Sequence, residues 1–146
     1  MAHKARAPSV EHLFIVNSAG GLIYYKAWGS GVAPLPGNDA LRIASTFHSL
    51  HAIATQLSPV SGGGGITELE SGHFMLRCLQ SPTGVKFFAT AAPSTRDVDE
   101  YLREVHRLYA DWVLKDPFYE LEMPIRVEKF EERLVALSSE RYPRAV

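Results

Sequence analysis

His48 and His51 are the first residues to consider for chemistry, because two imidazoles three residues apart on a helix can share one metal ion. No HExxH motif surrounds them and no third ligand is evident in the sequence, so we favour structural or interface roles for both. Cys78, the only cysteine, has no activating histidine or asparagine pattern attached to it. We interpret it as a small buried apolar side chain in a strand, and a single cysteine excludes an internal disulfide.

Two other patterns are incomplete versions of known motifs. The glycine run 62–65 lacks the Lys-[Ser/Thr] of a phosphate-binding loop and precedes a predicted strand, so no helix N-terminus would hold the phosphate. Asp97, Asp99 and Glu100 lie at the predicted start of a helix, where the helix dipole favours carboxylates. The sequence therefore predicts no catalytic residue, no cofactor and no metal site, and we expect a protein that is not an enzyme.

The segment 115–125 (KDPFYELEMPI) is the most unusual part of the chain. It holds Phe118, Tyr119, Met123 and two prolines outside any periodic pattern. Connecting segments are usually polar, so these apolar side chains must pack somewhere. Packing on the protein's own sheet and packing against a partner both stay open, since Tyr, Phe and Met are enriched in interface cores.

A second group of aromatic residues lies near the N-terminus. Tyr24 and Tyr25 are neighbours in a predicted strand, where adjacent side chains point to opposite faces of the sheet. The sheet therefore carries bulky apolar residues on both faces, and a partner is one way to cover one of them. We expect the isolated chain to self-associate or to need partners for solubility.

Length and composition limit the classes of protein to consider. The chain has 146 residues, a length typical of one domain, and 46% of them are hydrophobic, which argues against disorder. Fifteen Lys and Arg against sixteen Asp and Glu leave a net charge of -1, which argues against a general nucleic-acid binder. No apolar run approaches the roughly 20 residues of a membrane span. We expect a soluble, cytosolic, single-domain protein.

Hydrophobic periodicity predicts five strands, over residues 10–17, 22–28, 66–70, 74–80 and 85–91. A first helix begins at Asn38 or Asp39 and ends at Ser58. We expect it to bury a single apolar stripe, formed by Ile43, Phe47, Leu50, Ala54 and Leu57.

Two further helices follow the last strand. A variant capping box of Ser94 and Asp97 opens one of them, which ends at Asp116-Pro117. Pro124 lies in the first turn of the other. The order ββαβββαα predicts an α+β fold of the longin or profilin-like type, with helices packed on a five-stranded antiparallel sheet. We expect one domain over residues 10–140, a lead-in over 1–9 and a tail over 141–146.

Four segments in unbroken order carry a resemblance to a known family. They are NSAGGLIYYK (17–26), LRIASTFHSLHAIATQLSP (41–59), GITELESGHFMLRCLQSPTGVKFF (65–88) and YADWVLKDPFYELEMPIR (109–126). Over about residues 10–137 the chain resembles the sybindin family, the small longin-like core subunits of the TRAPP vesicle-tethering complex. The interval 29–37 lacks the PDZ-like insertion of some animal relatives.

The resemblance implies a function in an assembly. It implies partners among other small longin-like TRAPP subunits and among subunits of a second α/β type. It implies that the assembled core catalyses nucleotide exchange on a Rab/Ypt GTPase in ER-to-Golgi transport, with this chain in the cytoplasm, peripheral at the endoplasmic reticulum and cis-Golgi. The candidate interface residues are Lys115, Asp116, Pro117, Phe118 and Tyr119 in the family's most distinctive motif, with Met123, Pro124, Tyr24 and Tyr25.

An alternative function stays open at this point. Another longin-type trafficking adaptor, such as a small coat-adaptor chain or a SNARE-regulatory domain, is the second hypothesis; the segment 115–125 and the lack of a SNARE heptad helix argue against it.

Within the segment 115–125 we expect one of Phe118 and Tyr119 to point inward and the other outward. We favour Tyr119 as the outward residue, because its hydroxyl tolerates a wet rim.

Overall fold

The computed structural model describes residues 8–28, 33–59 and 65–143, so most of the expected lead-in, most of the glycine run 62–65 and the last three residues lie outside the described ranges. The elements are β1 (Val10–Val16), β2 (Leu22–Ala27), α1 (Asp39–Leu57), β3 (Glu68–Glu70), β4 (Met75–Gln80), β5 (Lys86–Ala91), α2 (Val98–Leu108), the π-helix η1 (Tyr109–Val113) and α3 (Glu128–Arg141). The described strands form one antiparallel sheet in the order β2-β1-β5-β4-β3, which confirms the predicted fold class.

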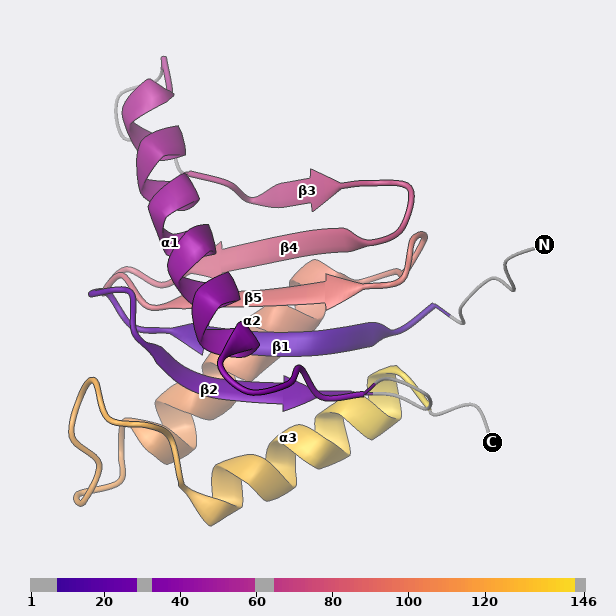
Figure 1. The fold of residues 1–146 in the computed structure, drawn as a ribbon. Helices are drawn as coiled ribbons and strands as arrows, with labels where there is room; N and C mark the ends of the chain where they lie inside the picture. The colour runs from indigo at the N-terminus through magenta and orange to yellow at the C-terminus, as the bar shows by residue number, and fades with distance from the viewer. Residues whose placement is uncertain (1–7, 29–32, 60–64, 144–146) are drawn as a thin grey trace.

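The sheet lies between two helical layers, with α1 across one face and α2 and α3 across the other (Figure 1). Alternation along β1 supplies both cores, because Leu13 and Ile15 join the α2/α3 side while Phe14 and Val16 join the α1 side. The bulky residues predicted on both faces are therefore present, and the protein's own helices cover them.

The α1 face differs from the expectation. The buried residues of α1 are Ala40, Ala44, Phe47 and His51. From the expected stripe only Phe47 is buried, whereas Ile43, Leu50 and Leu57 are exposed. The reason is steric, because the alanines let the helix lie against the aromatic layer of the sheet, where Phe47 stacks on Phe88 with ring centroids 4.3 Å apart.

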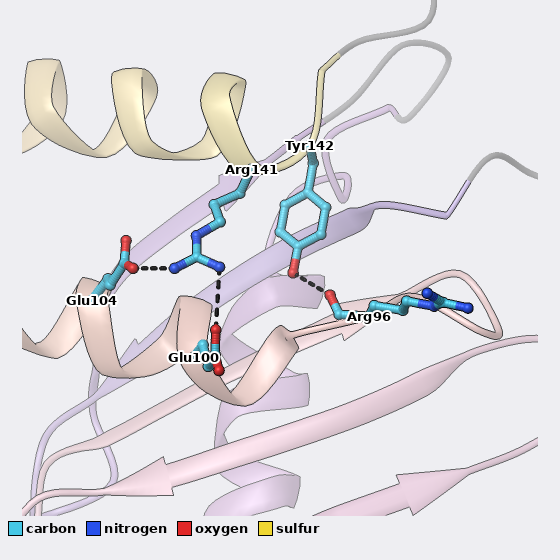
Figure 2. Close-up of polar contacts among 5 residues, drawn as sticks. All are labelled: Arg96, Glu100, Glu104, Arg141 and Tyr142. Atoms are coloured by element: carbon cyan, nitrogen blue, oxygen red, sulfur yellow. Dashed lines mark hydrogen bonds and ion pairs between the residues drawn. The ribbon is translucent and has the colours of Figure 1, made fainter.

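The α2/α3 layer is closed by polar contacts at the end of α3 (Figure 2). Arg141 forms ion pairs with Glu100 and Glu104 of α2. Tyr142 buries its ring and donates its hydroxyl to the backbone carbonyl of Arg96 at 3.0 Å. The contacts at the end of α3 thus include Tyr142, the residue that follows the helix.

Two predicted helix starts were wrong. The side chains of Ser94 and Asp97 form no capping box; Asp97 has a φ of +61° and makes no side-chain cap bond. Pro124 lies before α3, which starts at Glu128. The chain after Pro124 is held by the sheet, because the N–H of Ile125 donates to the carbonyl of Ile23 in β2 at 2.8 Å.

Glu131 links α3 to the edge of the sheet. Tyr24 and Lys26 of β2 both donate to its carboxylate. The ring of Tyr24 also meets Phe130 edge-on, with centroids 5.4 Å apart. Burial on its own raises the pKa of Glu131, but the bonds from Lys26 and Tyr24 outweigh it and hold the pKa below its ordinary value.

This carboxylate makes the stability of the fold depend on pH. The substitution Glu131→Gln should lower the free energy of unfolding at pH 7 by about 1 kcal/mol. The effect is small because the carboxylate is partly exposed to solvent. The folded pKa is lowered, so the contribution is complete above the ordinary pKa of 4.5 and is lost as the pH falls through the folded value. In urea unfolding, the gap between parent and variant should narrow as the pH is lowered below 4.5; a gap that stays constant contradicts the assignment.

Candidate protein interaction surfaces

His51 and Cys78, which were considered for enzyme chemistry, make contacts inside the domain. His51 is buried, and its Nε2 lies 2.8 Å from Oε1 of Gln80. Burial raises the pKa of the Cys78 thiol to about 12, the opposite of the shift that activates a nucleophile. Across the described ranges, no three His, Cys, Asp or Glu side chains are grouped to hold a metal, and no helix is long and apolar enough to cross a membrane.

The most exposed of the large apolar residues that the structure describes, Phe118, lies between η1 and α3, in residues 114–125, here called the connector. Phe118 keeps 91% of its surface exposed and Leu121 keeps 70%, while Leu114 and Met123 are about half exposed. Singly exposed apolar residues are ordinary, but four within ten residues form a patch. The connector is therefore the first candidate interaction surface.

The connector is braced by its own hydrogen bonds. The N–H of Leu114 bonds to the carbonyl of Tyr109 at 3.0 Å, which completes the wide turn of η1. Asp116 Oδ1 accepts the N–H of Phe118 at 2.9 Å, and the Tyr119 hydroxyl donates to the carbonyl of Met123 at 2.9 Å. Together with the anchor at Ile125, these bonds fix the path of the backbone.

The orientation within the motif is the reverse of the expected one. One aromatic residue points inward and the other outward, but Phe118 is the outward residue and Tyr119 packs on the core. Burial and the neighbouring Tyr109 raise the pKa of Tyr119 to about 12. The expectation failed because the Tyr119 hydroxyl finds a partner inside the connector, so this residue needs no contact with solvent.

The other sequence-predicted residues of the connector lie near the same patch. Lys115 pairs with Asp111 one helical turn earlier, at 3.6 Å. Pro117 and Pro124 are exposed and shape the loop. Asp116 is half-buried, with its carboxylate turned back onto the backbone.

Tyr24 and Tyr25, in β2, make contacts within the domain. Tyr24 bonds to Glu131, as described above. The Tyr25 hydroxyl accepts the N–H of Leu35 at 3.0 Å and lies 2.9 Å from Nδ1 of His12. Contacts of these two residues with a partner stay a prediction.

Sequence reasoning missed a second surface, on the outer side of α1. Its exposed residues recur at spacings of three and four, the pattern of a helix-pairing seam. We call it the α1 seam, formed by Ile43, Thr46, Leu50, Ile53 and Leu57. The spacing was visible in the sequence, but it was interpreted as the buried face.

The edge strand β3 is a third exposed feature. Within the described part of the sheet it pairs only with β4, and all three of its residues are exposed, including Leu69. An unpaired edge presents backbone donors and acceptors to any strand that approaches. The acidic Glu68 and Glu70 pair with Arg77 of β4 and thereby keep charge along this edge.

A family model and individual relatives of known name both match this chain, and they agree with each other. Residues 10–140 match the model of the Sybindin-like family. The chain is 46% identical over 127 residues to trafficking protein particle complex subunit 4 of Dictyostelium discoideum, covering 86% of this chain and 93% of that protein. It is 49% identical over 100 residues to subunit 4 of Bos taurus, covering 68% of this chain but only about half, 46%, of that longer protein.

More distant similarity extends to a second subunit and to other folds. The chain is 21% identical over 129 residues to trafficking protein particle complex subunit 1 of Rattus norvegicus, covering 86% of this chain and 89% of that protein. Among solved structures, a Roadblock/LC7 domain from Streptomyces avermitilis aligns with a TM-score of 0.52 and 15% identity, over 73% of this chain and 89% of that one. This last likeness concerns the fold alone.

The opposite exposures of the two aromatic residues predict opposite effects on stability. Tyr119→Ala should lower the free energy of unfolding by about 2 kcal/mol, through lost packing and the lost bond to Met123. Phe118→Ala should change it by less than about 0.5 kcal/mol. Urea unfolding measures both, with Tyr119→Phe as the control that keeps the ring. Equal destabilisation by the two alanine variants would contradict the orientation described above.

Proposed function

The chain belongs to the Sybindin-like family, and on this premise we propose that it is a non-enzymatic core subunit of a TRAPP-like tethering complex. The observation that carries the proposal is the α1 seam. Both faces of the sheet are already covered by the protein's own helices, so the exposed Leu50, Ile53 and Leu57 are not needed for the core. Apolar residues left outside a complete core in this pattern favour a protein partner.

The partner we propose for the α1 seam is a second small subunit of the same fold. Its support comes from the comparisons, since two differently numbered subunits of the same named complex are similar to this chain over most of its length. A subunit of the same fold would present its own first helix, and two helices pack by interleaving side chains at spacings of three and four. The exposed edge β3 gives such a partner backbone groups to pair with.

The finer function is that of a platform for a GTPase. We propose that the assembled core promotes nucleotide exchange on a Rab/Ypt GTPase in ER-to-Golgi transport, with this subunit cytoplasmic and peripheral to those membranes. Family membership supports this, and the sequence of this chain has no complete nucleotide-binding motif. The alternative of another longin-type adaptor is less favoured, because the relatives at 46% and 49% identity are both named as complex subunit 4.

Charges placed in the α1 seam should separate the subunits. The double variant Leu50→Glu and Ile53→Glu should abolish co-purification with the subunit 1 homologue of the same organism, since two carboxylates would be buried without partners. Both side chains are half exposed in the single chain, so the melting temperature should change little. Ser45→Glu, on another exposed side of α1, is the matched control and should bind normally. Normal binding by the double variant would rule out the seam as the pairing surface.

Exchange activity should require the assembly. Release of a fluorescent GDP analogue from the Rab/Ypt GTPase should be unchanged by this chain alone and stimulated by the reconstituted core. The Leu50→Glu and Ile53→Glu double variant should yield no active core, whereas Ser45→Glu should yield a normal one. Strong stimulation by the isolated chain would contradict the proposed division of roles.

A further inference from the structure

We propose that the connector is a second docking surface, which inserts Phe118 into an apolar pocket rimmed by Lys and Arg on another protein subunit. This inference rests on the proposed function, because it places a second neighbour in the same assembly. The inference also specifies the kind of surface that this second neighbour presents, which the α1 seam does not define.

Phe118 has the properties of a binding anchor. Its side chain is 91% exposed, so the ring makes almost no contribution to the core of this domain. The backbone that carries it is fixed on one side by the Asp116 side chain and on the other by the Tyr119 hydroxyl. A backbone that is already fixed loses little conformational entropy on binding, which favours affinity.

The backbone path of the connector depends on two unusual conformations. The π-helix η1 widens the last turn before Leu114, and such turns are frequent at functional sites. Glu122 has a φ of +77°, a conformation that costs a non-glycine residue energy and persists only where the surroundings enforce it. Both conformations accompany the exposure of Phe118 and Leu121, which indicates that this shape is maintained although it leaves these two apolar side chains in solvent.

The charges around the ring define the partner. Asp116, Glu120 and Glu122 alternate with the apolar residues along the segment, and its only lysine, Lys115, is paired with Asp111. In the part of the chain that the structure describes, neither Glu120 nor Glu122 forms an ion pair. A complementary surface therefore carries Lys or Arg around an apolar pocket.

The same charges disfavour other occupants. A second copy of this chain would bring an identical acidic rim against the first, and like charges at an interface are costly. An anionic membrane surface repels this rim for the same reason. The connector extends from the helical layer formed by α2 and α3, whereas α1 lies across the opposite face of the sheet (Figure 1). One chain can therefore hold a neighbour on each surface at the same time.

The test uses the reconstituted set of small TRAPP subunits of one organism, with this chain as parent or variant. Phe118→Ala should release one subunit other than the subunit 1 homologue, with a loss of affinity of at least about 30-fold. The double reversal Glu120→Lys and Glu122→Lys should weaken the same contact and reduce its dependence on salt. Val135→Ala, which trims an exposed apolar residue of α3, is the matched control and should bind normally.

A photo-crosslinking amino acid at position 118 identifies the neighbour in the same assembly. We expect a crosslink to an apolar site flanked by Lys or Arg on one other subunit. A crosslink to a second copy of this chain, a crosslink to an acidic site, or unchanged composition with Phe118→Ala would overturn the inference. If this chain instead joins no complex even as parent, the proposed function fails first; if it still pairs through α1 while Phe118 contacts nothing, only the docking role of the connector fails.

Discussion

The stack of Phe14, Phe88 and Phe47 is the contact on which the arrangement of this protein depends. Phe88 of β5 lies between the other two rings, with centroids 4.6 Å from Phe14 and 4.3 Å from Phe47. Phe47 is the only large apolar residue that α1 buries, and Ala40 and Ala44 complete the contact. Because α1 buries only Phe47, His51 and these two alanines, its other large apolar side chains are left outside the core and form an outer seam.

The other face of the sheet is organised differently, and the connector follows from that. Two helices cover it, joined by bonds from Tyr101 to Ser138 and from Arg141 to α2. The chain that links them returns to the sheet at Ile125 and leaves Phe118 in solvent. Each face thus has a complete core together with apolar residues that the core does not use, which is what a subunit with neighbours on two sides requires.

The sequence was sufficient for the strands and for the buried side of α2, and insufficient where the choice depended on packing. Apolar runs between turns predicted the five strands, and Tyr101, Leu102 and Val105 marked the buried side of α2. Periodicity located the apolar stripe of α1 but not the direction in which it faces, since the alanines opposite it gave no signal of burial. In the connector, the hydroxyl of Tyr119 suggested exposure, because its acceptor lies on a loop whose path depends on tertiary contacts. The interface roles of the predicted residues stay predictions.

Hydrogen exchange with mass spectrometric detection tests the central claim that α1 is a pairing surface. Amide exchange would be followed along the whole chain before and after saturation with the homologous subunit 1. The account predicts added protection confined to residues 39–57 and to the β3 edge at 68–70, with the connector unchanged until further subunits are present. Added protection that leaves both of these segments unaffected, or no binding at saturating concentrations, would contradict it.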